Sequence, residues 1–317
     1  MNSKIPIVVI SGPTGTGKTS LAIELCKRLN GEVISADSMQ IYKYMTIGTA
    51  KPTKEKMQGV PHHLVDFVMP GESYSVADFV SDATIAINDI VSRGKLPFLV
   101  GGTGFYINSL IDNIKFSEDK QDKILRSSLE EKARLEGNVS VWNILNGIDP
   151  ETASSLHPNN LFRVIRAIEV FRTTGITMSQ QQKLSRQEPS PYAPIMLALN
   201  YKDRELLYSR INNRVDKMLS QGLIEEIKSI IDLGFAGTAS QAIGYKEFLP
   251  YINSTSKSQK LLDECIDKLK METRRYAKRQ LTWLRRDTRY TYIYKDQMSS
   301  EEIIDFAYGY IKSKLND

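Results

Sequence analysis

The chain has 317 residues, a formal net charge of +5, and a composition of 41% apolar and 25% charged residues. This length allows one large domain or two smaller ones with a substantial core, and the composition excludes a disordered or fibrous protein. No apolar run reaches the roughly 18 residues of a membrane-spanning helix. The N-terminus enters a strand pattern at once and leaves no room for a signal peptide. Two distant cysteines, Cys26 and Cys265, indicate neither a disulfide framework nor a zinc site. We therefore expect a cytoplasmic protein.

The first residues combine a strand, a glycine-rich loop and the start of a helix. Residues 5–10 form an apolar, β-branched run with the length of a buried strand. The pattern G-x-x-x-x-G-K-[ST] follows, in the residues Gly12, Pro13, Thr14, Gly15, Thr16, Gly17, Lys18 and Thr19. The loop N–H groups and the helix N-terminus favour an anion, Lys18 adds positive charge, and the Thr19 hydroxyl can bind Mg²⁺. A chance match in a turn rich in glycine and threonine is the weaker alternative. The pattern predicts a site for a di- or triphosphate but does not identify its carrier.

A second strand pattern, residues 32–37, ends in the carboxylate of Asp37. In an α/β sheet this end lies on the ligand side, beside the phosphate loop. Asp37 and Gln40 are therefore candidates to act on a substrate. Capping of the next helical turn is an equally good interpretation of Asp37. The adjacent His62 and His63 lack a third ligand nearby, and we interpret them as structural.

Another strand–helix–strand unit follows and predicts a parallel sheet. Ser75 is an N-cap residue for a helix that stops at Gly94, and residues 96–100 form the next buried strand. This strand runs into a second glycine turn, residues 101–104, which can approach a ligand closely. Thr103 would present its hydroxyl there. A plain tight turn is the alternative, but two glycine turns at one sheet edge favour a functional role.

From residue 115 to residue 191 the pattern is charged, mostly helical and free of apolar strand runs. We interpret this segment as a helical insertion. Arg163 and Arg166 are three residues apart within it and share a helix face. After a further strand at residues 195–199, Arg210 and Arg214 are four residues apart on another helix. Surface ion pairs are the default role of such arginines.

A long helix is predicted from residue 257 to residue 286, with an apolar stripe along one side. Eight basic residues lie between positions 270 and 289: Lys270, Arg274, Arg275, Lys278, Arg279, Arg285, Arg286 and Arg289. Such a run is usually a solvated face. Because Tyr276 and Trp283 are interleaved with charges of mostly one sign, a polyanion, most simply a nucleic acid, explains it better.

Nine motifs in chain order resemble those of tRNA dimethylallyltransferases, also called tRNA isopentenyltransferases. They are GPTGTGKT, ISADSMQIY, IGTAKP, PHHLVD, YSVADF, LVGGTGFY, HPNNLFRVIRAIEV, QAIGYKE and KRQLTWLRRD. The resemblance covers nearly the whole chain. The helical insertion and the absence of a C-terminal zinc finger are similar to the bacterial form. Gly15 and Thr16 stand where many members have Ala-Ser, and since all four residues are small we expect phosphate binding to be retained.

The resemblance implies an α/β fold: a P-loop NTPase-like parallel sheet flanked by helices, with a helical insertion. Residues 1–114 and 192–317 would form the core, and residues 115–191 an insertion that binds tRNA. The implied reaction moves a dimethylallyl group from its diphosphate to the exocyclic amine of the adenosine 3′ of the anticodon, with Mg²⁺ assisting and pyrophosphate leaving. The partners would be the anticodon stem–loop of tRNA and dimethylallyl diphosphate, with no membrane, and we expect a monomer.

The resemblance also assigns roles to residues. Asp37 would be the general base, Thr103 would hydrogen-bond near the reacting centre, Lys18 and Arg210 would stabilise the leaving pyrophosphate, and Thr19 would bind Mg²⁺. The target base would be flipped into a channel. The family's RNA-contacting positions correspond to Asp37, Ser38, Met39, Gln40, Thr103, Phe162, Arg163, Val164, Ile165, Arg166, Gln241, Ala242, Ile243, Gly244, Tyr245, Lys246, Lys278, Arg279, Gln280, Leu281, Thr282, Trp283, Leu284 and Arg285.

Three other functions compete. A prenyltransferase for free adenine nucleotides would share the core motifs, and only the predicted RNA-binding segments argue against it. A small-molecule kinase with a P-loop would explain the loop and the sheet but not the basic helix or the insertion. A non-catalytic RNA-binding module would leave Lys18, Asp37 and Thr103 at one sheet edge unexplained.

Overall fold

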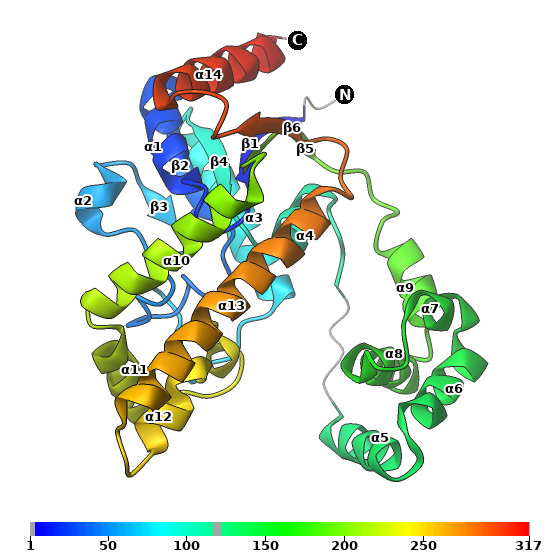
Figure 1. Ribbon diagram of the computed structural model, residues 1–317. Coiled ribbons are helices and arrows are strands. Elements are labelled where there is room, and N and C mark those ends of the chain that lie inside the picture. The colour runs from blue at the N-terminus through cyan, green and yellow to red at the C-terminus, as the bar shows by residue number, and fades with distance from the viewer. Residues whose placement is uncertain (1–3, 117–121, 317) are drawn as a thin grey trace. The chain divides into compact units, whose positions relative to one another are not determined.

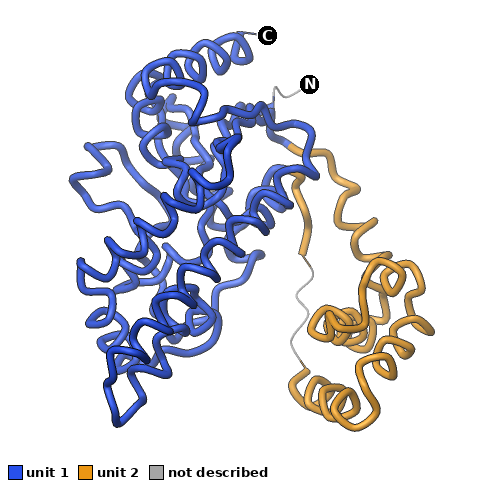
Figure 2. The backbone as a smooth tube through the Cα atoms, viewed as in Figure 1, with its two compact units in different colours: residues 1–111, 191–317 blue, residues 112–190 orange. Residues whose placement is uncertain are grey.

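The structure is a computed structural model that describes residues 4–116 and 122–316 (Figure 1). The chain divides into two compact units. Residues 1–111 and 191–317 form the first unit, and residues 112–190 form the second (Figure 2). No helix in the described residues is long and apolar enough to cross a membrane.

The first unit is built on one parallel sheet with the order β3-β2-β4-β1-β5-β6 in the described residues. The strands are β1 (Ile5–Ser11), β2 (Gly31–Ser35), β3 (His62–His63), β4 (Leu96–Gly101), β5 (Tyr192–Asn200) and β6 (Thr291–Tyr294). The central strand β1 pairs through Val8 with Phe98 of β4 on one side and Ile195 of β5 on the other. Because all the strands are parallel, their carboxyl ends meet at one edge. The α/β fold predicted from the sequence is confirmed.

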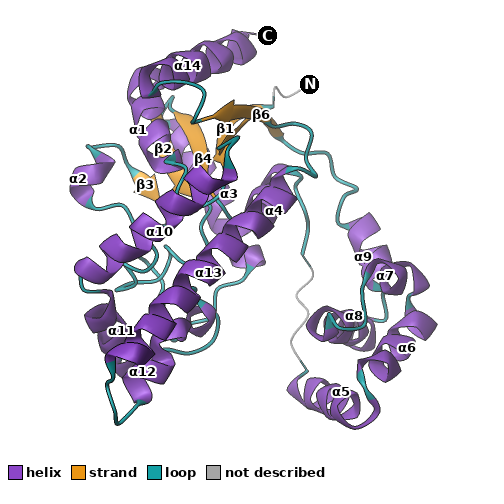
Figure 3. Cartoon of the chain, in the orientation of Figure 1, coloured by secondary structure: helices purple, strands orange, loops and turns teal. Residues whose placement is uncertain are grey.

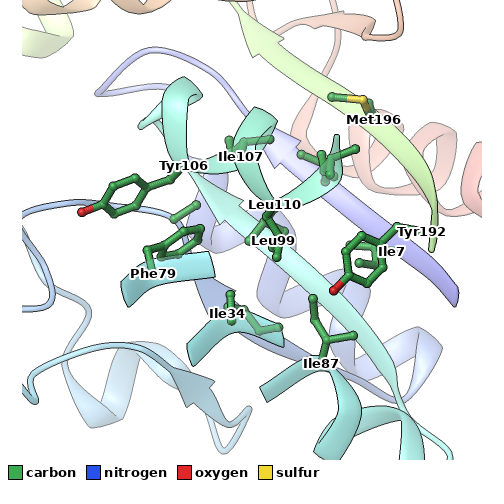
Figure 4. Close-up of a cluster of buried hydrophobic side chains, with 14 of the residues drawn as sticks. Ile7, Ile34, Phe79, Ile87, Leu99, Tyr106, Ile107, Leu110, Tyr192 and Met196 are labelled. Atoms are coloured by element: carbon green, nitrogen blue, oxygen red, sulfur yellow. The ribbon is translucent and has the colours of Figure 1, made fainter. Parts of the chain in front are cut away.

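Both faces of the sheet are covered, which explains the continuous apolar runs of the strands. Alternate residues such as Ile7 and Leu99 pack against α3 (Val76–Ser92) and α4 (Gly104–Ile111), as Figure 4 shows. Their neighbours pack on the other face against α1 (Lys18–Leu29) and α14 (Ser300–Asn316).

A third core of the first unit lies among helices beyond the sheet edge. Its longer helices are α10 (Arg204–Ser220), α11 (Leu223–Asp232) and α13 (Gln259–Leu284). The shorter elements of this core are η1 (Ala239–Gln241), η2 (Lys246–Phe248) and α12 (Leu249–Asn253). The short helix α2 (Lys54–Met57) has no buried residue. The long basic helix is confirmed, with each end two residues inside the predicted range. It begins after Ser258, whose hydroxyl accepts a hydrogen bond from the Leu261 N–H.

The regular secondary structure in the described residues of the second unit is helical, and loops connect the helices (Figure 3). Its helices are α5 (Lys123–Glu136), α6 (Asn138–Ile148), α7 (Pro150–Ser155), α8 (Leu161–Thr174) and α9 (Met178–Leu184). The fully buried Glu169 of α8 accepts hydrogen bonds from Arg126, Arg166 and the backbone N–H of Asp122. Burial raises the pKa of Glu169, but these bonds outweigh it and bring the pKa down to about 2.

Candidate active site

The phosphate loop connects β1 to α1, as the sequence pattern requires. Gly15 and Gly17 have φ angles of 85° and 83°, which side-chain-bearing residues rarely adopt. A Cβ on Gly12 would lie 2.4 Å from the carbonyl oxygen of Leu199, so only glycine fits there. The Lys18 ammonium donates to the carbonyl of Pro13 (3.0 Å), which folds the side chain back over the loop. The strand, loop and helix therefore form the expected anion-binding geometry.

A cavity of about 760 Å³ opens beside this loop within the first unit. Seven segments of the sequence line it: the phosphate loop, residues 37–40, residues 48–50, residues 100–101, α10, residues 241–246 and α13. Figure 1 shows α10 and α13 crossing the molecule beside the sheet edge. The phosphate loop contributes polar wall, whereas Val215, Met218 and Leu269 contribute apolar wall. One cavity can thus accept both a charged group and a hydrocarbon chain.

Cations gather around the phosphate loop. Arg210 of α10 donates through Nε to the carbonyl of Gly15 (3.3 Å), and Arg214 donates to the carbonyl of Thr49 (3.4 Å). A Cβ built on Gly17 would lie 4.0 Å from the Lys295 ammonium. Within the described residues, Lys18 and these three cations form no ion pair with a carboxylate. The surface ion-pair interpretation of Arg210 and Arg214 is therefore wrong.

Burial lowers the pKa of three members of this cation cluster. Burial lowers the pKa of Lys18 to about 8, with Arg214 adding to the shift and Asp37 opposing it. Burial also lowers the pKa of Arg214, against the attraction of Asp37. The pKa of Lys295 is lowered by burial and by Arg210. A bound polyphosphate would reverse these shifts because it restores opposite charge at short range. The sequence analysis missed Lys295, although it directly follows β6 and so lies at the ligand edge of a parallel sheet.

Asp37 follows β2 at the same edge. Its Oδ1 accepts hydrogen bonds from the backbone N–H groups of Met39 (2.9 Å) and Gln40 (3.3 Å). Asp37 therefore caps the turn that follows it, as the capping interpretation predicts, although residues 38–41 form a turn and not a helix. Oδ2 accepts no hydrogen bond from the described residues. Asp37 therefore combines a structural oxygen with one that can take a proton.

Thr103 lies beside Asp37 because the ends of β2 and β4 approach each other closely. A Cβ on Gly101 would lie 2.1 Å from the carbonyl oxygen of Ala36, which makes glycine necessary there. The Thr103 N–H donates to that carbonyl (3.1 Å), and Thr103 Oγ1 accepts from the Ser38 N–H (3.1 Å). The second glycine turn is therefore part of the site rather than a plain turn.

Gln280 contacts the protein itself. Although the resemblance places it among RNA contacts, it is 6% exposed, and its amide bonds to both glycine loops. Gln280 also lines the cavity, so its expected contact with RNA stays a prediction.

Several other expected RNA contacts lie in cores. Val164 and Ile165 pack in the core of the second unit. In the first unit Tyr245, Leu281 and Leu284 are buried, so none of these five side chains can contact RNA in this structure.

Part of the 241–246 segment is buried as well. Gly244 is buried, and Ala242 borders the cavity with 2% of its surface exposed. Other expected RNA contacts stay exposed, namely Phe162, Arg163, Gln241, Lys246, Lys278, Arg279, Thr282 and Arg285. Arg166, in contrast, pairs with Glu169 at 2.7 Å.

The side chains that could act as metal ligands indicate how the site could bind Mg²⁺. No group of three or more His, Cys, Asp or Glu side chains in the described residues could hold a metal ion. His63 instead contacts Glu32 at 2.8 Å. Thr19 borders the cavity beside the phosphate loop. One hydroxyl together with substrate phosphates and water is a ligand set that suits Mg²⁺, which keeps several waters and takes few protein ligands.

The fold and the cavity define a P-loop protein with a carboxylate and a hydroxyl beside the phosphate site. The family model described as IPP transferase matches residues 40–287, and one described as isopentenyl transferase matches residues 5–67. This chain belongs to the IPP transferase family, so the resemblance seen in the motifs is confirmed.

Individual relatives agree over almost their full lengths. A tRNA dimethylallyltransferase of Caldanaerobacter subterraneus subsp. tengcongensis is 47% identical, over 98% of this chain and 99% of that protein. The solved structure of the full-length tRNA isopentenylpyrophosphate transferase of Bacillus halodurans has 45% identity and a TM-score of 0.71, with 99% of each chain covered. A eukaryotic dimethylallyltransferase acting on tRNA has 32% identity and a TM-score of 0.78, over 98% of this chain and 80% of that one.

Proposed function

We propose that this protein transfers a dimethylallyl group from dimethylallyl diphosphate to the exocyclic amine of an adenosine in tRNA, immediately 3′ of the anticodon. The observation that carries the proposal is the cavity that Asp37 and cations of the unpaired cluster line together, with Thr103 bonded to the backbone beside Asp37. The names of the relatives support the same reaction. The polar and apolar walls of the cavity suit a diphosphate that carries a hydrocarbon chain.

The cation cluster stabilises the pyrophosphate leaving group. As the allylic C–O bond stretches, negative charge grows on the pyrophosphate. Lys18, Arg210 and Arg214 line the cavity at the phosphate loop, and with the loop N–H groups they would stabilise this charge. Mg²⁺, held by Thr19 and the phosphate oxygens, would supply further neutralisation of the diphosphate.

Asp37 acts as the general base for the nucleophile, which is the adenine amine. An adenine amine is conjugated with its ring and is a weak nucleophile, so its proton must leave as the new bond forms. The balanced step forms the C–N bond, breaks the C–O bond, transfers one N–H proton to Oδ2 of Asp37 and releases pyrophosphate. Thr103 holds the turn beside Asp37 through the Ser38 N–H.

The acceptor is RNA because exposed basic residues of α13 continue from the cavity along the helix. Arg279 lines the cavity, and Lys278 and Arg285 are exposed nearby on the same helix. Phosphate contacts there would orient a stem–loop while its target base is flipped toward Asp37. All of these groups come from one chain, so a monomer suffices, and a tRNA substrate places the protein in the cytoplasm.

A direct assay separates the candidates. The protein is incubated with dimethylallyl diphosphate, Mg²⁺ and either AMP or an anticodon stem–loop, and the nucleosides are analysed by mass. We expect the stem–loop with adenosine at the target to be prenylated at a kcat/KM far above that of AMP. The stem–loop with guanosine should be inert, since guanine has an oxygen at that ring position. Equal efficiency with AMP would favour a free-nucleotide prenyltransferase, and phosphate transfer from ATP would favour a kinase.

A further inference from the structure

We propose that Gln280 is a positioning residue that locks the phosphate loop to the second glycine turn and so sets the diphosphate at a fixed distance from Asp37. This proposal rests on the proposed function for the identity of the diphosphate. It assigns Gln280 a role inside the reaction centre rather than in RNA binding.

Both ends of the Gln280 amide are used. Its Oε1 accepts a hydrogen bond from the Thr14 N–H (2.9 Å), and its Nε2 donates to the carbonyl of Gly102 (3.0 Å). The two partners lie 266 and 178 residues away in the sequence. Because one end must accept and the other must donate, an amide fits this position and a carboxylate, an amine or a hydrocarbon does not.

The surrounding backbone is shaped around this side chain. A Cβ on Gly102 would lie 2.0 Å from Nε2 of Gln280, so the turn approaches the amide as closely as glycine permits. Gln280 is 6% exposed and borders the cavity, so little water reaches its amide. A Thr14 N–H or Gly102 carbonyl left without this partner would disfavour the present arrangement of the two loops.

The link joins the two halves of the proposed reaction. The sheet itself joins β1 to β4 as far as Ser11 and Gly101, and Gln280 adds a connection between the loops that follow. On one side, Thr14 belongs to the loop that holds the leaving group. On the other, Gly102 precedes Thr103, which bonds to the backbone on both sides of Asp37. A shift of about 1 Å between reacting groups can cost about 10²-fold in rate.

Two substitutions test the link. Gln280→Met keeps the length of the side chain and removes both hydrogen bonds. Gln280→Glu keeps the acceptor for the Thr14 N–H but loses the donor to Gly102 when ionised. A protonated glutamic acid has the acceptor and the donor of glutamine, so the Gln280→Glu variant should recover activity as the pH falls. Gln259→Met is the matched control, because Gln259 is an exposed residue at the start of the same helix that bonds only locally to Asp263.

The assay measures kcat and KM for prenyl transfer to the stem–loop, the affinity for inorganic pyrophosphate with Mg²⁺, and thermal unfolding. We expect Gln280→Met to lower kcat by about 10- to 100-fold and to weaken pyrophosphate binding, with the KM for RNA within twofold of the parent. The rate of Gln280→Glu relative to the parent should rise between pH 8 and pH 5.5.

Three results would overturn the proposal. They are unchanged kcat and pyrophosphate affinity in folded Gln280→Met, an effect on the KM for RNA alone, or a Gln280→Glu rate ratio that does not change with pH. Pyrophosphate binding is measured without turnover, so a failure of the proposed function in the parent protein would be recognised separately.

Discussion

Replacing Asp37 by asparagine separates its two roles. The Asn side chain keeps a carbonyl oxygen that can accept from the Met39 and Gln40 N–H groups, as Oδ1 does now. It cannot take a proton from the adenine amine. The turn should therefore persist in Asp37→Asn while the general base is lost.

The expected loss follows from that base alone. Removing a positioned general base lowers kcat by about 10²- to 10⁴-fold, which corresponds to about 3–5 kcal/mol of transition-state stabilisation. Asp37 also raises the pKa of Lys18, so the substitution should lower that pKa. The removal of a negative charge near the diphosphate favours donor binding and opposes this effect, so the donor KM should change little.

The assay is steady-state prenylation of the adenosine stem–loop at pH 7, with thermal unfolding measured alongside. Asp37→Ala serves as the comparison because it loses the base and the turn together, and should unfold more readily than Asp37→Asn by about 1 kcal/mol. If Asp37→Asn turned over at near the parental rate while Asp37→Ala was impaired, Asp37 would be a turn residue only and the proposed mechanism would be refuted.

Three further predictions concern other parts of the chain. The KM for the diphosphate should rise by up to tenfold per pH unit above about pH 8, because Lys18 loses its proton there. A donor KM that stays constant from pH 7 to 9.5 would contradict this prediction, and so would the same pH profile in Lys18→Arg. Replacing the exposed Lys278, Arg285 and Arg286 by glutamine should weaken stem–loop binding and reduce the slope of log K against log salt by about 0.7–0.9 per lost phosphate contact, and unaltered RNA affinity would identify a merely solvated face. Glu169→Gln should destabilise the protein by about 3 kcal/mol at pH 7 in urea unfolding. Since the folded pKa of Glu169 lies near 2, below the unfolded value of about 4.5, this difference should shrink as the pH falls from about 4.5 toward 2, and a difference independent of pH would disprove the role of its charge.

Local patterns in the sequence were sufficient for the fold and the centre of the site. The apolar runs of β1 and β4 and the glycine loops after them predict a parallel sheet with a phosphate site at one edge. Lys18, Asp37 and Thr103 could be selected because each follows or ends a strand pattern. These features depend on residues that are close together in the sequence, so the local hydrophobic pattern is enough to predict where they lie.

Contacts between distant segments were decided only by the tertiary structure. Arg214 and Lys295 join the phosphate loop because α10 and the end of β6 are folded onto it. No local pattern distinguishes Arg214 from a surface cation, whereas the position of Lys295 directly after a strand was a local signal for it. Gln280 lies in a run of charged residues, between exposed Arg279 and buried Leu281. Its burial follows from the face of α13 that packs on loops 266 and 178 residues away. The period of a helix predicts which residues share a face, but it does not predict what that face packs against. What the face packs against determines whether a polar side chain of α13 contacts RNA or the phosphate loop.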